Sequence, residues 1–580
     1  MLFADICWGM SQAILKSFVV VTKNITSTRI SITTASKIKL SFLLPLTPQH
    51  PSSSMRVNRS MMRMYLSISV ILNIIALITL FLPTDRARGL MGDAAWKGLA
   101  KYGLTRRPDD PAILTVPAKG CSMCEVDPVL CEEIGEENLK RSLAFSGTNR
   151  RLRRVLAKLR RGETINVGAI GGSVTKGFGL NRYNEPYYPD TPTNLHRIIF
   201  DHLVSLYPAP NGVMTGDSGR KEGKHGFING GQGATGTGYF SYCWEEHVPA
   251  DLDLIFIEQA INDELLIQNI NSYELLVRGL LDLPTSPAIV NLEVFALMFK
   301  TITLGGDLHQ GIAQFYDLPV LSLRNALLND MLKNDSLINE YFFIHPEGDV
   351  DLRHISRKGH NVLGRIGAAY MDSQICEMDK YEQGIPGADS MSIDQLYPVE
   401  PIPRIQINMK YDKDLVLPTV KPQCFSANSD RHPLSPVENN GWRKWNWKEK
   451  HYFVADVPGS RISFKLKTHI GKIEIQYLRS YQYHQGSAKC WVDGEVERAI
   501  KLDGYWKEPY NIGRAVTIRE GLEIGDHTLT CELLKQTADP EGGTEFRLIS
   551  VMRCVIFCKY KCLYSPTLYN AHSVADFSIC

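Results

Sequence analysis

The sequence predicts an α/β domain built on a parallel sheet, followed by a C-terminal antiparallel β-sandwich. Between residues 163 and 378, strand-like apolar runs alternate with amphipathic helical segments, a pattern typical of a parallel sheet covered by helices on both faces. From residue 410, short strand-like stretches follow one another between Gly and Asp turns, as in a sandwich. The composition, 44% hydrophobic and 22% charged over 580 residues, is that of a globular protein and excludes wholesale disorder and fibrous folds.

Charge and cysteine content say less about the class of protein than the strand and helix pattern does. The 64 Lys and Arg against 62 Asp and Glu leave a net charge of +2, which argues against a nucleic-acid partner held by bulk charge. The 13 cysteines suit an oxidising compartment, but a cytosolic chain of this size is also able to carry them. Their odd number leaves at least one thiol unpaired.

An uncharged apolar run at residues 64–83 predicts a single transmembrane helix. At about 1.5 Å per residue, a helix of this length crosses a hydrocarbon core of ~30 Å. The alternative, a buried core helix, fits less well because such a helix normally has a polar face. Most cysteines and all candidate catalytic residues follow the run, so we expect residues 1–63 to be a cytosolic tail. The expectation is a single-pass membrane protein whose catalytic domain lies in the secretory-pathway lumen or outside the cell.

Both ends of the chain read as extensions of the gene model. Residues 1–54 are rich in Ser, Thr and Lys without a period, and Met55 is a natural start. Residues 554–580 form an irregular tail with neither a helical nor a strand period. Glycosylation sequons begin at Asn24, Asn58 and Asn334, and only Asn334 faces the lumen in the expected orientation, which marks the chain as a possible glycoprotein.

Residues 84–140 are interpreted as a stem. They contain Cys121, Cys124 and Cys131, and a CxxC pair is either a zinc half-site, a redox pair or part of a disulfide framework. No second CxxC stands at zinc-finger distance, so structural disulfides are favoured. The basic run that follows, residues 150–161, has apolar residues at helical spacing. It therefore predicts an amphipathic helix with a solvated basic face, in preference to a nucleic-acid patch.

The predicted α/β domain occupies residues 141–378. Its expected strands are residues 164–170, 252–257, 288–295 and 318–323, and its expected helices are residues 195–206, 325–333 and 356–378. Ligand sites in such sheets lie beyond the carboxyl ends of the strands, which directs attention to the residues that follow each strand.

Three strand ends carry side chains or loops suited to acyl chemistry. Ser173 follows the first strand in the turn AIGGS, where a nucleophile would be exposed; the turn lacks GxGxxG or GKS/T, which disfavours nucleotide binding. A glycine-rich loop at residues 228–240 is able to aim backbone N–H groups at an oxyanion, unless it is a plain flexible loop. Asn262 follows a later strand and is either an oxyanion donor or a turn former.

A histidine base stands near the end of the domain. In DLRHISRKGH, Asp351 precedes His354 by three residues, so that the carboxylate is able to orient the imidazole that takes the Ser173 proton. His345 is a rival base. His354 is preferred because it has the aspartate partner and keeps the distance to His360.

Taken in order, these motifs resemble the SGNH hydrolase superfamily, the GDSL-like esterases and lipases. GGS stands where that family often has GDS, IND matches its GxND block with Ile for Gly, and DLRH matches its DxxH block. The resemblance covers residues 163–378 and implies a flavodoxin-like three-layer α/β/α fold. The arrangement of the whole chain also resembles fungal membrane-anchored proteins with an esterase domain of this type.

The resemblance implies roles for individual residues. Ser173 is similar to the nucleophile, His354 to the base and Asp351 to its partner. The oxyanion donors that it implies are Ser173, Gly233, Ala234 and Asn262. The glycine of the family's second block falls on Ala234, which leaves the identity of that donor open. No metal and no cofactor is implied.

The expected function is hydrolysis of ester groups, O-acetyl groups above all, on a carbohydrate or polysaccharide. Alternatives are an O-acetyltransferase with the same residues and a non-catalytic glycan-binding protein on the hydrolase scaffold. Residues 379–409 read as a linker, and residues 410–553 as the sandwich, in which Cys490 and Cys531 are placed to bridge. The tryptophans of the sandwich either stack on sugar rings or belong to its core; they are Trp442, Trp445, Trp447, Trp491 and Trp506.

Overall fold

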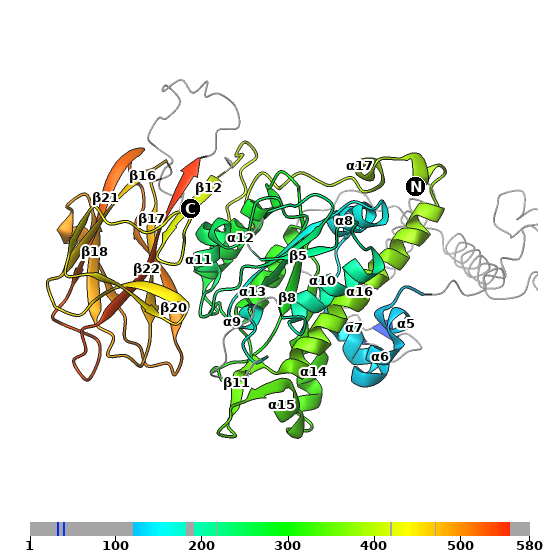
Figure 1. Ribbon diagram of the computed structural model, residues 1–580, viewed down its shortest axis with the longest axis horizontal. Helices are drawn as coiled ribbons and strands as arrows, with labels where there is room; N and C mark the ends of the chain where they lie inside the picture. Colours follow the sequence, from blue (N-terminus) through cyan, green and yellow to red (C-terminus); the bar gives the residue numbers. More distant parts are fainter. Residues whose placement is uncertain are drawn as a thin grey trace, which may run out of the picture. The chain divides into compact units, whose positions relative to one another are not determined.

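Figure 1 shows the computed structural model of the chain, which describes residues 32–33, 39–40, 120–180, 191–216, 219–417, 420–469 and 471–556. The chain divides into two compact units, Met1–Val116 and Pro117–Cys580. In the first unit, the strands β1 (Ile32–Thr33) and β2 (Lys39–Leu40) pair antiparallel. The predictions for the rest of residues 1–119 and for residues 557–580 lie outside the described residues.

A seven-stranded sheet forms the centre of the α/β domain. Its strands are β3 (Leu143–Phe145), β4 (Asn166–Gly171), β5 (Val213–Thr215), β6 (His225–Asn229), β7 (Leu254–Glu258), β8 (Ala288–Glu293) and β9 (Val320–Ser322). Their order across the sheet is β3-β9-β8-β7-β4-β6-β5, and only the β3–β9 pair is antiparallel. The run β6-β4-β7-β8-β9 has the 2-1-3-4-5 order of flavodoxin-like folds, which confirms the predicted fold class.

The central strands are buried along their whole length, which explains their continuous apolar sequence. Every residue of β4, β7 and β8 is buried, as expected for parallel strands covered on both faces. In the register, Val167 pairs with Leu254 on one side and with Phe227 on the other. The carboxyl ends of β4, β6 and β7 therefore meet at one edge, from which the three candidate loops depart.

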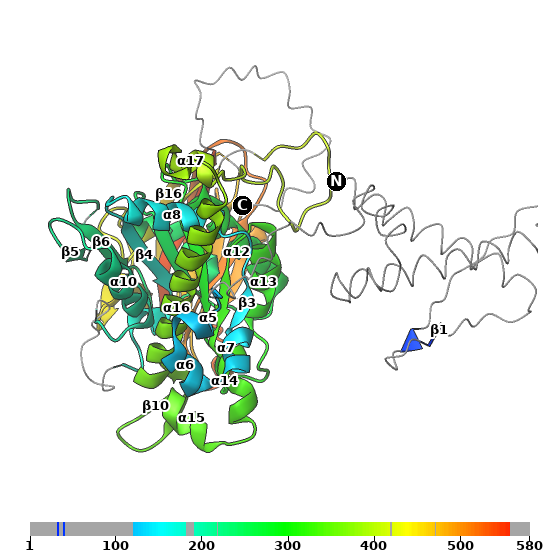
Figure 2. The ribbon, with the colours of Figure 1, turned by 90° about the vertical axis from the view of Figure 1, so that its right-hand side faces the viewer.

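Helices cover both faces of the sheet (Figures 1 and 2). The helices that share a hydrophobic cluster on one face are α8 (Arg150–Arg160), α10 (Leu195–Leu206), α14 (Leu323–Met331) and α16 (Arg357–Gln383). Those that share a cluster on the other face are α11 (Thr237–Cys243), α12 (Ile267–Leu281) and α13 (Gly305–Phe315). The domain thus has three layers, α/β/α, with most of its core between the helices and the sheet.

Shorter elements complete the α/β domain. They are α9 (Ser173–Lys176), η1 (Trp244–Glu246), α15 (Ser336–Tyr341), β10 (Phe342–Ile344), β11 (Val350–Ile355), η2 (Ala388–Ser390) and α17 (Ile393–Leu396). The strands β10 and β11 form a separate antiparallel hairpin. This hairpin carries the predicted DxxH block and leads directly into α16.

Residues 120–140, assigned to a stem by the sequence, instead pack onto the α/β domain. They form α5 (Met123–Val126), α6 (Pro128–Ile134) and most of α7 (Glu136–Ser142). Their apolar side chains, fully buried Leu130 among them, join the same hydrophobic cluster as α16. A disulfide joins Cys121 to Cys376 on α16, and a second joins Cys124 to Cys131. The prediction of structural disulfides is confirmed, and they explain why this short helical segment stays on the domain.

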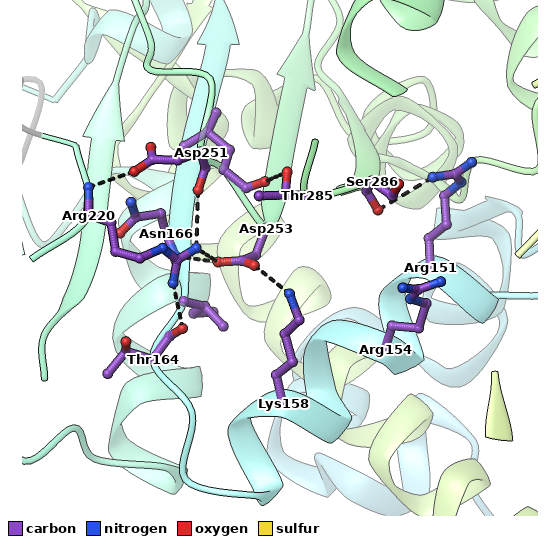
Figure 3. Close-up of polar contacts among 12 residues, drawn as sticks. Arg151, Arg154, Lys158, Thr164, Asn166, Arg220, Asp251, Asp253, Thr285 and Ser286 are labelled. Carbon is purple, nitrogen blue, oxygen red and sulfur yellow. Dashed lines mark hydrogen bonds and ion pairs between the residues drawn. The ribbon is translucent and has the colours of Figure 1, made fainter. Parts of the chain in front are cut away.

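The basic run on α8 is an amphipathic helix, as predicted. Its charges are matched within the chain: Lys158 Nζ lies 2.8 Å from Asp253 Oδ1, and Arg154 Nη2 lies 2.6 Å from Asp394 Oδ1. Figure 3 shows Lys158 and Arg220 meeting the same buried carboxylate, Asp253, from α8 and from the loop before β6. The basic side chains of α8 therefore form ion pairs with Asp394 of α17 and with Asp253, the residue before β7.

The C-terminal domain is a sandwich of two antiparallel sheets. The first sheet contains β12 (Val420–Ser426), β14 (Arg443–Trp447), β15 (Lys450–Ala455), β17 (Ile473–Arg479), β20 (Ile512–Arg519) and β22 (Phe546–Ile556). The second contains β13 (Glu438–Asn440), β16 (Arg461–Thr468), β18 (Ser487–Val492), β19 (Ile500–Asp503) and β21 (Gly525–Leu533). A short 3-10 helix, η3 (Val496–Arg498), precedes β19.

Neighbouring strands β18 and β21 are bridged by Cys490–Cys531, as the sequence suggests. Of the two interpretations of the tryptophans, a place in the core is confirmed for three of them, and stacking on sugar rings stays a prediction for the other two. Trp442, Trp491 and Trp506 are buried, whereas Trp445 and Trp447 are partly or largely exposed.

The sandwich and the α/β domain belong to one compact unit and are joined covalently. The disulfide Cys243–Cys424 connects α11 to β12, and Met552 of β22 lies in the hydrophobic cluster of α11 and α12. Arg514 of β20 forms an ion pair with Glu264. These contacts place the first sheet of the sandwich against the helical layer beside the glycine-rich loop (Figure 1).

The membrane prediction is not supported. Within the described ranges, every helix is either too short or too polar to serve as a membrane span. The longest, α16, carries charged residues along its length, because it packs one face on the sheet and turns the other to solvent. The single-pass membrane location is therefore withdrawn; residues 64–83, on which it rested, lie outside the described residues.

Candidate active site

Ser173 lies at the point where β4 ends and α9 begins. Two glycines precede it, and neither has room for a side chain. A Cβ on Gly171 would lie 1.9 Å from Thr175 Oγ1, and a Cβ on Gly172 would lie 2.0 Å from Asn262 Oδ1. The turn therefore requires Gly-Gly, and it brings Ser173 to the carboxyl edge of the sheet beside Asn262.

Ser173, His354 and Asp351 form a continuous hydrogen-bonded relay. Ser173 Oγ is 2.8 Å from His354 Nε2, and His354 Nδ1 is 2.6 Å from Asp351 Oδ2. An ionised carboxylate only accepts, so Nδ1 carries the proton and donates it to Asp351. Nε2 of the neutral ring is then the acceptor, and the Ser173 hydroxyl donates to it. Ser173 and His354 thus stand in the protonation states that a serine nucleophile and its histidine base need for acyl transfer.

The surroundings keep Asp351 charged and His354 neutral. Burial alone would raise the pKa of Asp351, but the hydrogen bond and charge of His354, with the Arg353 N–H and guanidinium, lower this pKa to about 2. Burial lowers the pKa of His354 below its usual value, the contact with Asp351 opposes that shift, and the charges of Arg353 and Lys450 add to it. At neutral pH the imidazole is therefore free to accept a proton.

The neighbouring histidines have other roles. His345 Nε2 lies 3.8 Å from Asp351 Oδ2, the same oxygen that His354 Nδ1 contacts at 2.6 Å, and His354 bridges Asp351 and Ser173. His360 Nε2 contacts the Phe178 carbonyl at 3.2 Å, and the ring of Phe178 stacks on His354 with 4.8 Å between centroids. His360 thus supports the segment that holds the base in place.

Candidate oxyanion donors converge beside Ser173. Asn262 lines the same cavity as Ser173, and its buried Oδ1 has no hydrogen-bond partner among the described residues. The backbone N–H groups of Gly233 and Ala234 likewise have no acceptor among the described residues. A Cβ on Gly233 would lie 3.8 Å from the Ser173 Cβ, which places this loop against the nucleophile. The structure thus brings together all six predicted site residues: Ser173, Gly233, Ala234, Asn262, Asp351 and His354.

Ala234 holds a backbone conformation that favours glycine. Its φ is 60°, in the left-handed region, where a Cβ costs about 1 kcal/mol. The β-sandwich secures this conformation, because Gly513 N–H of β20 donates to the Ala234 carbonyl at 2.7 Å and Thr235 forms a bridge to Gly513. The loop that presents the candidate donors is therefore held by the second domain.

The site opens into a cavity of about 320 Å³ whose walls come from both domains. The α/β domain supplies the Ser173–His354–Asp351 relay and the Gly233–Ala234 loop, named here the oxyanion loop after its proposed role. The sandwich residues that line the cavity include Trp447, Lys450, Tyr481, Tyr483 and Arg547. The sequence does not indicate the last four of these, because nothing in their spacing connects them to the motifs of the α/β domain. The only signal was the tryptophan-rich stretch that contains Trp447.

Comparison with known proteins agrees with the two-domain architecture. No family model and no curated protein matches the chain. Among solved structures, the chain is similar to a two-domain esterase active on acetylated mannans, co-crystallised with mannopentaose, with 21% identity and a TM-score of 0.52 over 73% of this chain and 99% of that one. A second structure of a two-domain esterase active on acetylated mannans matches with 19% identity and a TM-score of 0.50 over 72% and 99%. At this identity the likeness shows a shared fold: an esterase-like α/β domain followed by a β-sandwich.

Proposed function

We propose that this protein is a serine carbohydrate esterase of the SGNH type that removes O-acetyl groups from a polysaccharide or oligosaccharide. The observation that carries the proposal is the Ser173–His354–Asp351 relay, with contacts of 2.8 and 2.6 Å, at the edge of a flavodoxin-like sheet. The shared fold with esterases active on acetylated mannans supports the substrate class.

The first half of the reaction acylates Ser173. Its Oγ attacks the ester carbonyl carbon while His354 Nε2 takes the hydroxyl proton. The negative charge that develops on the carbonyl oxygen is met by Asn262 Nδ2 and the N–H groups of the Gly233–Ala234 loop. His354 then protonates the departing sugar oxygen, the C–O bond breaks, and an acetyl-serine remains.

The second half releases the acetyl group. Water enters the place of the sugar, gives a proton to His354 Nε2 and attacks the acetyl carbonyl. The same oxyanion donors hold the second tetrahedral intermediate, and its collapse returns the proton to Ser173 Oγ with release of acetate. Asp351 keeps its charge throughout and stabilises the imidazolium that forms twice in the cycle.

The aromatic lining of the cavity supports a sugar as the substrate. Trp447, Tyr481 and Tyr483 line it, and 36, 41 and 40% of their surfaces are exposed. Exposed aromatic rings at a site offer apolar faces and polar tips, which suits the mixed surface of a sugar ring. All three belong to the sandwich, so the domain that lacks the relay forms the wall that meets the glycan.

The test compares the full-length protein with Ser173→Ala on p-nitrophenyl acetate and on acetylated mannan oligosaccharides, with acetate release as the readout. Ser205→Ala, an exposed serine on α10, is the matched control. We expect the wild type and Ser205→Ala to release acetate, and Ser173→Ala to lose at least about 10³-fold in kcat. Equal rates for the wild type and Ser173→Ala would refute the role of Ser173 as the nucleophile. No acetate release by any of the three proteins would refute the esterase function.

A further inference from the structure

A lysine from the sandwich reaches the reaction centre. Lys450 begins β15, lines the cavity and is only half-buried. Its Nζ lies 3.2 Å from the place that a Cβ on Gly233 would take, and the Ser173 Cβ lies 3.8 Å from that same place. The ammonium group therefore stands beside the oxyanion loop and close to the nucleophile, although it plays no part in the relay.

The charged side chains around the cavity are mostly cationic. Arg353, Lys450 and Arg547 line it, against one carboxylate among the described residues, Asp351, which is hydrogen-bonded to His354. Arg547 is matched outside the cavity, because its Nε donates to Glu545 Oε1 at 2.6 Å. Lys450 forms no ion pair with any described carboxylate, and its Nζ lies 5.6 Å from the centroid of the Trp447 ring.

The surroundings of Lys450 favour the binding of an anion beside its ammonium group. Burial lowers its pKa to about 8; Glu449 opposes the shift, while Lys176, Arg353 and Lys448 add to it. The side chain is still mostly protonated at neutral pH. A partly desolvated cation beside other cations is costly, and a bound anion relieves both the lost hydration and the repulsion.

We propose that the glycan substrate carries a carboxylate, as in a uronosyl residue on or next to the acetylated sugar, and that Lys450 binds this carboxylate together with Arg353, which lines the same cavity. This inference rests on the proposed esterase function and adds the substrate class to it. The α/β domain performs the ester chemistry, and the cation of the sandwich selects acidic glycans over neutral ones. A lysine is suited to this task because it is a compact charge on a flexible stem that adapts to the position of the carboxylate.

The first test measures binding, so that it does not depend on catalysis. The full-length Ser173→Ala variant is titrated calorimetrically with acetylated glucuronoxylan oligosaccharides and with the same oligosaccharides after reduction of their carboxylates to alcohols. We expect the acidic form to bind at least about tenfold more tightly than the reduced form. This difference in affinity should shrink as salt rises from about 50 to about 500 mM, because salt screens the attraction between the carboxylate and the cations. Equal binding of the two forms, or binding of neither, would overturn the proposal.

The second test assigns the preference to Lys450. Lys450→Met and Lys450→Arg are compared in the Ser173→Ala background, and Lys465→Met, on an exposed position of β16 outside the cavity, is the matched control. We expect Lys450→Met to remove the preference for the acidic form, and Lys450→Arg and Lys465→Met to keep it. A preference that survives in a folded Lys450→Met variant, checked by its thermal unfolding midpoint, would assign the selectivity elsewhere and contradict the inference.

A third measurement separates failure of the inference from failure of the esterase function. The wild type is assayed for acetate release from the acidic and the reduced oligosaccharides. Release from both forms at equal kcat/KM would refute the proposed preference for acidic glycans but would be consistent with the esterase function. A higher kcat/KM on the acidic form, lost in Lys450→Met, is the result that the inference predicts.

Discussion

The two domains contribute to the same cavity in different ways. The α/β domain supplies the groups placed to react, Ser173, His354, Asp351 and Asn262, all at the ends of strands or in the hairpin beside them. The sandwich supplies aromatic rings and cations, and its strand β20 holds the oxyanion loop through Gly513. Under the proposed function, the α/β domain determines the type of reaction and the sandwich determines the choice of substrate.

Substitutions in the Ser173–His354–Asp351 relay should have the largest effect on the reaction rate. A small effect would contradict the proposed division of tasks between the two domains. Asp351→Asn replaces an acceptor by a side chain that is able to donate, which favours the wrong tautomer of His354. We expect kcat to fall by about 10³–10⁴-fold with little change in KM. The measurement is steady-state hydrolysis of p-nitrophenyl acetate, with Asp349→Asn, an exposed residue of the same hairpin, as control. A loss below tenfold would show that Asp351 does not orient the base.

Removal of the side-chain oxyanion donor is expected to have the next largest effect. Asn262→Ala deletes the amide that faces the cavity beside Ser173. We expect a decrease of about 10²–10³-fold in kcat, because this hydrogen bond strengthens as charge develops in the transition state. A variant that raises KM at unchanged kcat would instead make Asn262 a binding residue and weaken the division between the domains.

The pH dependence tests the base. Because burial lowers the pKa of His354, the acid limb of kcat/KM should have its inflection below the ordinary value of 6.5. Protonation as pH falls through that pKa removes the acceptor for the Ser173 proton, so the rate should drop about tenfold per pH unit below the inflection. The charged groups nearest the ring are Asp351, Arg353 and Lys450. An inflection above 6.5 would mean that Asp351 outweighs burial.

Changes on the sandwich side should be smaller and should depend on the substrate. Tyr481→Ala removes an exposed ring from the cavity wall, and such contacts are worth about 0.5–1.5 kcal/mol, or up to about tenfold in kcat/KM. We expect the loss to be larger on acetylated oligosaccharides than on p-nitrophenyl acetate. Equal losses on both substrates would show that the sandwich acts on the reaction itself.

The smallest expected effect concerns the strained loop. Ala234→Gly relieves the cost of a positive φ, against which the glycine's greater freedom in the unfolded chain must be set. We expect a change in the free energy of unfolding of no more than about 1 kcal/mol, measured by urea denaturation, with the esterase activity retained. A loss of activity above tenfold would indicate that the alanine side chain itself shapes the oxyanion site.

The fold of the α/β domain and the residues that meet at its candidate site were predictable because local patterns determine them. The strand ends, the Gly-Gly turn before Ser173 and the three-residue spacing of Asp351 and His354 are all read within short windows of sequence. The contribution of the sandwich to the site was not predictable, because Lys450 and Arg547 reach the site only through the packing of the two domains. The same reason hid the disulfides Cys121–Cys376 and Cys243–Cys424, which join residues 255 and 181 positions apart. Residues 120–140 were read as a stem because short helices tied down by disulfides have little periodicity.

The central claim is that Ser173 is an activated nucleophile inside a cavity that both domains form. A biotinylated fluorophosphonate, which reacts with activated serines, tests it directly when the modified residue is identified by mass spectrometry. The account predicts stoichiometric labelling of Ser173 in the wild type, and loss of labelling both in His354→Ala and on prior incubation with an acetylated oligosaccharide. Labelling of a different serine, or labelling of Ser173 that persists unchanged in His354→Ala, would contradict the account.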